Sequence, residues 1–402
     1  MPELVEHVIR PVGTPVGLTD GCTGLTDRER VSAAIKGRPV DRFPVAVPYI
    51  MLLQCDHWCE ITGRPAWTYY DWLIQDPAEH VRAYEDFDQR LPFDILQPHR
   101  ALTRQRREAL EVVHQGGKHY YHDRRSGEMS LLNEDLPHSQ SGPNQTQRVF
   151  DRADVERLVE VQPAERLLES GVYDYIREAR QMWGDKVLMN GVEGTFWRCT
   201  FYVGETRLFT MLYDAPDLLH YLSARLLEKT IEEIRALAAA GHDAIYVDDA
   251  LTTCDMISAE FYERFSMPYV KAMVDEIHAL GKKAVLIYFG GVADRLAQIA
   301  SLGADALNVE TSMKSYTNDL GDIAAQVGDR LCLWGNIDPV SVVQNGTEED
   351  LRQAIAQQVE IGRRTGKFIV STGSPITPLT PLPRIRRFID LGRESGAAEP
   401  PR

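Results

Sequence analysis

Residues 244–309 contain three short apolar runs separated by longer amphipathic segments: Ala244-Ile245-Tyr246-Val247, Ala284-Val285-Leu286-Ile287 and Ala306-Leu307-Asn308-Val309. Short apolar runs that alternate with segments of helical length are typical of parallel strands joined by crossover helices. The alternation continues in both directions along the chain. It predicts further strands at 187–190, 331–334 and 368–371 and helices at 215–240, 259–280 and 348–365.

Six such strand–helix units and an earlier apolar run at 43–48 favour a (β/α)8 barrel over an open sheet. No G-x-G-x-x-G or G-x-x-x-x-G-K-[ST] motif follows any predicted strand, which argues against a nucleotide-binding open sheet. We expect one barrel domain at 26–394, an N-terminal arm at 1–25 and a C-terminal tail at 395–402. The barrel carries an N-terminal elaboration, mostly helical over 50–112, with a hairpin and polar loop inserted at 113–147.

The composition excludes several classes of protein. The 402 residues include 44 basic and 59 acidic side chains, a formal net charge of −15, which argues against nucleic-acid and anionic-membrane binding. No apolar run is long enough to span a membrane, and the acidic first residues do not form a signal peptide. Six cysteines are too few for a disulfide scaffold, so we expect a cytoplasmic protein.

Polar side chains follow most of the predicted strands, where the active sites of such barrels lie. Converging carboxylates can move protons, bind a metal or face a cationic substrate, but each of them can also cap the following helix. We select Glu193, Asp248 and Glu310 first, because they end three separate strands, and Tyr288 as a proton donor. Trp197, near Glu193, is an aromatic residue that could line a pocket. The remaining candidates are Asp249, Asn336, Asp338, Thr372 and Ser374.

Several segments, in their order and spacing, resemble the uroporphyrinogen decarboxylase superfamily over residues 27–394. They are the opening Arg28-Glu29-Arg30-Val31 through Pro39-Val40-Asp41-Arg42-Phe43-Pro44, the Gly335-Asn336-Ile337-Asp338-Pro339 segment, and the terminal Gly373-Ser374-Pro375-Ile376-Thr377-Pro378-Leu379-Thr380-Pro381. The resemblance implies a distorted (β/α)8 barrel. It also implies one of two chemistries: cofactor-free decarboxylation of uroporphyrinogen, or methyl transfer involving corrinoid or thiol acceptors, often with zinc. The decarboxylase branch is dimeric, so a homodimer is expected.

The sequence departs from the known patterns of both chemistries. Residues 48–54 lack the arginines that bind the polycarboxylate substrate in the decarboxylase, and Asp94 is the one residue that matches its central aspartate. The thiol methyltransferases hold zinc at positions that are Ile287, Phe289 and Ser374 here, so zinc is not expected at the usual site.

The resemblance that remains is to enzymes that take a methyl group from a small methoxylated or N-methylated compound and pass it to a corrinoid (cobalamin). In such enzymes the corrinoid is often carried by a partner protein. Glu193, Asp248, Glu310 and Tyr288 are then the catalytic residues. The residues expected to contact substrate are Asp94, Trp197, Asp249, Asn336 and Ser374. The alternatives are a cofactor-free decarboxylase of a different carboxylic acid and a barrel that binds a tetrapyrrole without catalysis.

Overall fold

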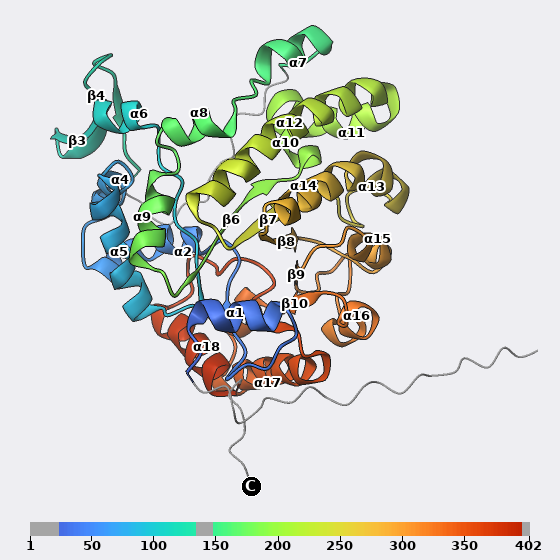
Figure 1. Cartoon of the computed structure of the whole chain (residues 1–402). Coiled ribbons are helices and arrows are strands. Elements are labelled where there is room, and N and C mark those ends of the chain that lie inside the picture. Colours follow the sequence, from blue (N-terminus) through green and yellow to red (C-terminus); the bar gives the residue numbers. More distant parts are fainter. Residues whose placement is uncertain (1–23, 134–147, 396–402) are drawn as a thin grey trace, which may run out of the picture.

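Eight parallel strands form one sheet in the computed structural model, which describes residues 24–133 and 148–395. Their order is β1-β11-β10-β9-β8-β7-β6-β2, and helices surround the sheet (Figure 1). The predicted (β/α)8 barrel is therefore confirmed. The expected 134–147 loop and most of the expected arm and tail lie outside the described residues. The strands are β1 Val45–Ala46, β2 Ile95–Leu96, β6 Val187–Glu193, β7 Ala244–Asp248, β8 Lys283–Tyr288, β9 Ala306–Val309, β10 Cys332–Trp334 and β11 Phe368–Ser371.

The helices that follow the strands form the outer layer of the barrel. Capping side chains start several of them, such as Thr26 and Glu29, which form a capping box at the start of α1. The helices are α1 Asp27–Ile35, α2 Ile50–Asp56, α3 Trp58–Thr62, α4 Trp67–Trp72, α5 Pro77–Arg90, α6 Arg104–Ala109, α7 Arg152–Leu158, α8 Ala164–Glu169, α9 Asp174–Met182, α10 Thr195–Val203, α11 Glu205–Asp214, α12 Pro216–Ala240, α13 Ala259–Phe265, α14 Met267–Ala279, α15 Leu296–Ser301, α16 Leu320–Val327, η1 Pro339–Gln344, α17 Glu348–Thr365 and α18 Leu382–Ser395.

Two predictions of element bounds were wrong. The strand β2 lies within the segment that was interpreted as mostly helical, since two strand residues are too few to give a periodic pattern. The expected helix at 259–280 is two helices, α13 and α14, which meet at Ser266. Pro268 has no amide hydrogen to continue a helix from the preceding turn, so it fits the start of α14.

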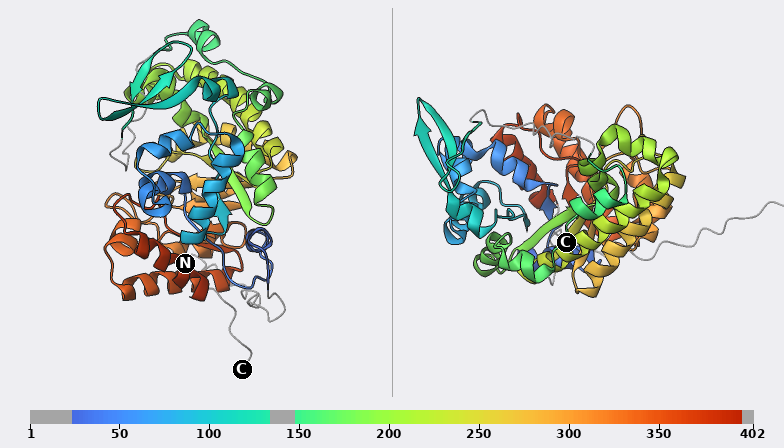
Figure 2. Two further views of the ribbon diagram at one scale, coloured as in Figure 1. Left: turned by 90° about the vertical axis from the view of Figure 1, so that its left-hand side faces the viewer. Right: turned by 90° about the horizontal axis from the view of Figure 1, so that it is seen from above.

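The predicted hairpin is part of a separate three-stranded antiparallel sheet that projects from the barrel (Figure 2). It consists of β3 Leu110–Gln115, β4 Lys118–Asp123 and β5 Met129–Leu131. The turn over 124–127 joins β4 to β5, and Gly116-Gly117 joins β3 to β4, both glycines having positive φ.

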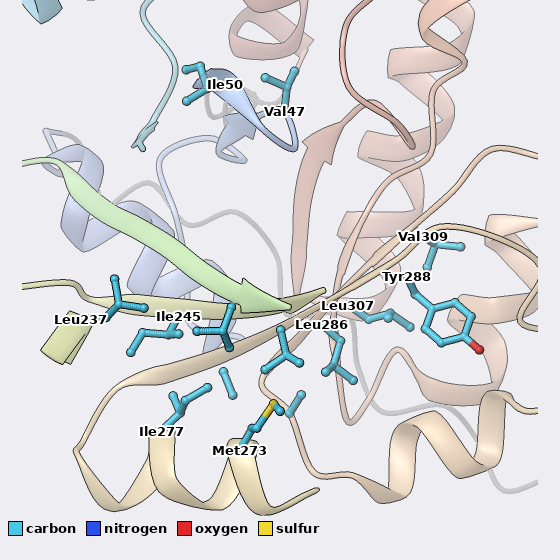
Figure 3. Close-up of a cluster of buried hydrophobic side chains, with 14 of the residues drawn as sticks. Val47, Ile50, Leu237, Ile245, Met273, Ile277, Leu286, Tyr288, Leu307 and Val309 are labelled. Atoms are coloured by element: carbon cyan, nitrogen blue, oxygen red, sulfur yellow. The ribbon is translucent and has the colours of Figure 1, made fainter. Parts of the chain in front are cut away.

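Side chains alternate between the barrel interior and the outer helical layer along each strand, as the pleat requires. On β8, Val285 and Ile287 face the interior cluster, whereas Leu286 and Tyr288 belong to the core between strands and helices (Figure 3). Helix α1 contributes Val31 to the interior cluster from the N-terminal end of the strands. The C-terminal strand ends are therefore the end of the barrel at which a site can form.

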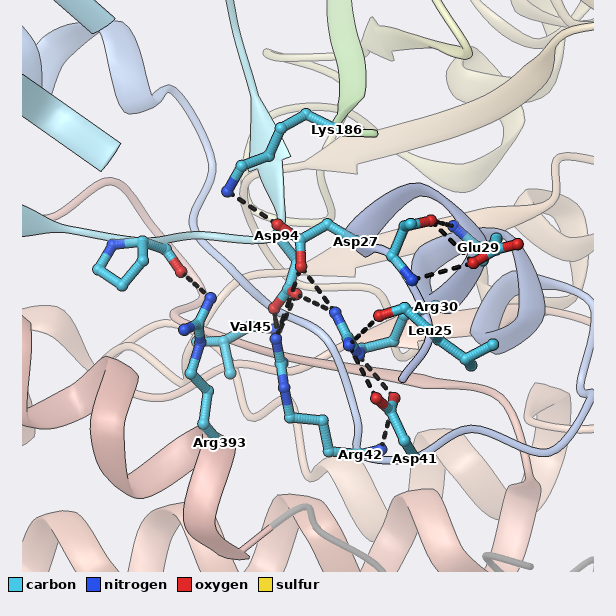
Figure 4. A network of polar contacts seen from close by, with 12 residues as sticks. Leu25, Asp27, Glu29, Arg30, Asp41, Arg42, Val45, Asp94, Lys186 and Arg393 are labelled. Carbon is cyan, nitrogen blue, oxygen red and sulfur yellow. Dashed lines mark hydrogen bonds and ion pairs between the residues drawn. The ribbon is translucent and has the colours of Figure 1, made fainter. Parts of the chain in front are cut away.

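A buried aspartate closes the sheet where β1 and β2 fail to pair. The Asp94 amide donates to the Val45 carbonyl at 3.1 Å, and the Val45 amide donates to Asp94 Oδ2 at 2.8 Å. Arg30 and Arg42 donate to the same carboxylate, and Asp27, Asp41 and Lys186 extend the network (Figure 4).

Candidate active site

Glu193 and Asp248 lie side by side at the C-terminal ends of β6 and β7, where they are direct partners in the parallel register. Both face the barrel interior, because they continue the inward series of Met189 on β6 and Tyr246 on β7. Asp248 is 2% exposed, whereas the Glu193 side chain is 36% exposed. The structure therefore brings together two of the three leading sequence candidates and gives them different environments.

Burial, together with the charges of Glu193 and Asp249, raises the pKa of Asp248 to about 7 despite the opposing hydrogen bond from Tyr49. Both protonation states are thus populated near neutral pH. Two neighbouring acids with unequal surroundings are the usual basis for dividing acid and base roles between them.

Glu193 lies near two arginines that the sequence did not single out. Arg198 of α10 approaches it to 3.8 Å while pairing with Glu233 at 2.9 and 3.0 Å. Arg100, in the loop after β2, donates to the Gly191 carbonyl, and the charges of Glu193 and Glu233 help to hold its pKa above the ordinary value despite burial.

Tyr49 is a residue of this site that sequence reasoning missed. Its hydroxyl donates to Asp248 Oδ2, and its ring centroid lies 5.6 Å from those of both Tyr246 and Phe289. The Tyr49 backbone has φ 51° and ψ 55°, a left-handed conformation that is uncommon and costly for a residue other than glycine. The proline-flanked run 43–48 located the strand before it, but no motif indicated that Tyr49 reaches β7.

Glu310 follows β9 at the same end of the barrel, and two hydroxyl groups fix its carboxylate. Ser374 Oγ donates to Oε1 at 2.6 Å, and the Tyr316 hydroxyl donates to Oε2 at 2.8 Å. Ser374, a predicted substrate residue, therefore lies beside Glu310, and Tyr316 is a second residue that the sequence analysis did not select. This geometry holds a carboxylate in one orientation, and no cation among the described residues pairs with it.

A prediction for Glu310 follows from these contacts. Glu310→Gln keeps the side-chain length and one acceptor oxygen but removes the negative charge. We expect turnover to fall about 100-fold or more, the range for loss of a positioned acid–base group. The melting temperature should stay within about 2 °C, since the side chain is only partly buried and the glutamine is nearly isosteric. Steady-state kinetics and thermal unfolding of Glu310→Gln and of Ser374→Ala measure the turnover and the melting temperature. If Glu310→Gln loses stability but keeps its turnover, the role of Glu310 is structural.

Three further candidates have structural contacts. Asp249 faces outward, where the Ser266 hydroxyl donates to its Oδ1 at 2.7 Å, and burial raises its pKa to about 6. The Asn336 amide donates to the Asn318 carbonyl at 2.9 Å, and Asp338 Oδ1 accepts from the first amides of η1 at 2.8 and 3.0 Å. These contacts favour the helix-capping and loop-holding interpretation for these residues.

The structure corrects the roles expected for Tyr288 and Asp94. Tyr288 points away from the interior, is fully buried and donates to the Thr252 carbonyl at 2.5 Å (Figure 3), so it cannot serve as the proton donor beside Asp248. Asp94 precedes β2 and therefore lies at the N-terminal end of the barrel within the arginine network (Figure 4). Trp197, on α10, is partly exposed and packs near Phe201 with ring centroids 6.1 Å apart.

The residues at the family's zinc positions do not fit a zinc ion. Ile287 and Phe289 carry no ligand atom and pack in or against the interior cluster, and Ser374 Oγ is bonded to Glu310. Within residues 24–133 and 148–395, no group of three or more His, Cys, Asp or Glu side chains could hold a metal ion. None of the helices described there is long and apolar enough to cross a membrane.

The fold and site define a (β/α)8 barrel with acidic groups at its C-terminal strand ends. Residues 136–395 match the family described as uroporphyrinogen decarboxylase (URO-D), and the chain belongs to this family. It is 28% identical over 261 residues to uroporphyrinogen decarboxylase of Tolumonas auensis, covering 62% of this chain and 70% of that protein. The enzyme of Pseudomonas putida is 30% identical over 269 residues, with 64% and 72% covered.

A solved methyltransferase from Methanosarcina mazei shares the fold. It has a TM-score of 0.64 at 19% sequence identity, over 92% of this chain and 99% of that one.

Proposed function

We propose that the chain is a methyltransferase that removes a methyl group from a small methoxylated or N-methylated compound and transfers it to a reduced corrinoid. The corrinoid is a second substrate in this proposal, free or on a partner protein. The observation that carries the proposal is the pair Glu193 and Asp248. Glu193 is partly exposed and lies 3.8 Å from Arg198, whereas Asp248 is buried and its pKa is raised to about 7. Such a pair can position a methyl donor and protonate its leaving group.

The charge at this end of the barrel supports a methyl donor over a polycarboxylate. Glu193, Asp248 and Glu310 all lie at C-terminal strand ends, and Arg198 is engaged by Glu233. A substrate with many carboxylates would meet these acids without an arginine clamp, which the recognition of carboxylates normally needs. The methyltransferase from Methanosarcina mazei is consistent with this fold carrying methyl transfer.

A second candidate is decarboxylation of a different, less charged acid. The relatives named uroporphyrinogen decarboxylase favour it. So does Arg100, which has no carboxylate within 4 Å among the described residues and could hold a single substrate carboxylate. Decarboxylation would release carbon dioxide without any methyl acceptor.

An anaerobic absorbance assay separates the two candidates. We expect the cob(I)alamin band to decline when the protein is mixed with a methyl donor from a panel of aryl methyl ethers and quaternary amines. Asp248→Asn protein should give no more loss than the buffer control. If no donor reacts, with free cob(I)alamin or with corrinoid proteins supplied as acceptor, and candidate acids release carbon dioxide instead, the decarboxylase proposal replaces this one.

A further inference from the structure

We propose that Tyr49 and Asp248 act together as a proton-donating pair, and that the methyl donor is therefore an aryl methyl ether that leaves as a phenol. This inference rests on the proposed function and narrows it from two donor classes to one. Tyr49 becomes a positioning residue that acts through the Asp248 carboxyl group. Neither residue's place in such a pair was indicated by the sequence.

The two oxygens of the Asp248 carboxyl group have different surroundings. Oδ2 accepts the Tyr49 hydroxyl hydrogen, whereas Oδ1 is buried and has no hydrogen-bond partner among the described residues. The Ala250 amide favours the charged form without reaching hydrogen-bonding geometry. Because Oδ2 already accepts a hydrogen bond, a proton bound by Asp248 belongs on Oδ1, where it has no acceptor within the protein. Buried polar atoms are normally paired, so a partner supplied by a ligand is expected at Oδ1.

The groups that face this carboxyl come from several elements. Glu193 comes from the end of β6, Tyr246 from β7 and Tyr49 from the loop after β1. Asp249, the residue after β7, faces outward, but its charge also acts on Asp248. The two acids disfavour a second negative charge, and the tyrosine hydroxyls are neutral because burial raises their pKa values well above the ordinary range. The surroundings thus keep a proton available on Asp248 while Glu193 remains beside Arg198.

The chemistry of the leaving group separates the two donor classes. A quaternary ammonium leaves as a neutral amine and gains nothing from a proton donor, whereas an ether oxygen leaves poorly unless it is protonated. The rings of Tyr246 and Phe289 pack around Tyr49 with centroids 5.6 Å from it, so the surroundings of the Asp248 carboxyl group include aromatic rings, beside which an aryl group is favoured. The pair therefore suits an aryl methyl ether.

The atoms and electrons of the step balance. The bond between the methyl carbon and the ether oxygen breaks, and its electron pair stays on oxygen. That oxygen takes the proton of Asp248 and leaves as a phenol, while the reduced corrinoid supplies the electron pair of the new bond to the methyl carbon. Asp248 remains as a carboxylate that the Tyr49 hydroxyl stabilises until solvent returns a proton.

Infrared difference spectra between the wild type and Asp248→Asn test the pair without any turnover. We expect the carbonyl band of a protonated carboxyl group at pH 6, with a titration midpoint near neutrality. Tyr49→Phe removes the hydrogen bond that favours the anion, so the midpoint should move up by about one pH unit. Tyr246→Phe is the matched control, since its hydroxyl lies near Asn190 and not on Asp248. Its midpoint should stay in place. An ionised Asp248 at pH 6, or equal midpoints in wild type and Tyr49→Phe, would overturn the pair.

The donor panel tests the substrate class separately. Methyl transfer from aryl methyl ethers, with activity lost as pH rises through the infrared midpoint and that loss moved to higher pH in Tyr49→Phe, supports the inference. Transfer from quaternary amines alone would overturn the inference and leave the proposed function standing. No methyl transfer together with carbon dioxide release would overturn the proposed function, whatever the infrared result.

Discussion

Asp248→Asn should abolish turnover and at the same time stabilise the protein at alkaline pH. The asparagine keeps the shape of the side chain and an oxygen that can accept the Tyr49 hydroxyl hydrogen, but it has no proton to donate to a leaving group. Loss of a general acid typically lowers the rate by about 100- to 10,000-fold, so we expect a decrease in that range.

The stability change follows from the sign of the pKa shift. The folded protein raises the Asp248 pKa from 3.8 to about 7, so the native state binds this proton more tightly than the unfolded chain does. The contribution of Asp248 to stability is therefore most favourable below pH 4 and is lost as pH rises from about 4 to about 7. Between pH 5 and pH 8 the wild type should lose about 3 kcal/mol relative to Asp248→Asn.

Urea unfolding of both proteins at pH 5 and pH 8 measures this difference directly. Asp249→Asn is a useful control, because its pKa is also raised by burial but its carboxyl group faces outward onto Ser266. It should show the stability effect over a lower pH range without a comparable loss of turnover. If Asp248→Asn has the same pH dependence of stability as the wild type, Asp248 is ionised in the native protein at neutral pH.

The barrel was predictable because each strand between 187 and 371 is a short apolar run and each connection is a long amphipathic one. That pattern repeats six times. Because connections between parallel strands are right-handed, the pattern also gives the order of the strands. The strand β2 escaped prediction because Ile95–Leu96 are two residues in a segment of helices. Its place in the sheet comes from pairing with β6, Ile95 with Val187 and Leu96 with Leu188, a long-range contact that no local period encodes.

The site was predictable as far as strand ends could be located, and no further. The ends of β6 and β7 gave Glu193 and Asp248, and their shared register follows from parallel pairing. The role of Tyr288 was predicted wrongly, although its direction could be inferred from the sequence. Ile287 occupies a position that faces the site in the family, and side chains alternate along a strand, so Tyr288 must face outward. Tyr49 and Arg100 could not be found, because each reaches the site from a loop after a strand of only two residues.

Asp94 was linked to substrate because Phe93-Asp94-Ile95-Leu96 resembles a family segment, yet the side chain lies before its strand rather than after it. A shift of a few residues moves a side chain from the C-terminal to the N-terminal end of a short strand. At that end Asp94 is fully buried and accepts hydrogen bonds from Arg30 at 2.9 Å, from Arg42 at 2.6 and 2.8 Å and from the Val45 amide.

Asp94→Asn should therefore be the most destabilising of the substitutions considered, with little effect on turnover per folded molecule. Burial alone would raise the pKa of Asp94, but the hydrogen bonds and charge of Arg42 outweigh it and hold the pKa at about 2. Removing the anion leaves the buried guanidinium of Arg30 and the partly buried guanidinium of Arg42 facing a neutral amide, and breaking a buried ion pair in this way costs about 3 to 5 kcal/mol.

The pH dependence of this effect has the opposite sign to that of Asp248. A lowered native pKa contributes stability that is complete above pH 4 and is lost as pH falls from about 4 to about 2. Urea unfolding at neutral pH should show the full loss, and the difference between the wild type and Asp94→Asn should shrink in acid. Asp41→Asn is the matched control, because Asp41 also binds Arg30 but is 19% exposed, so its loss should be smaller. A stable Asp94→Asn protein without turnover would return Asp94 to the substrate site. If Asp94→Asn protein is unfolded in part at neutral pH and its folded fraction has normal activity, the role of Asp94 is to close the barrel between β1 and β2.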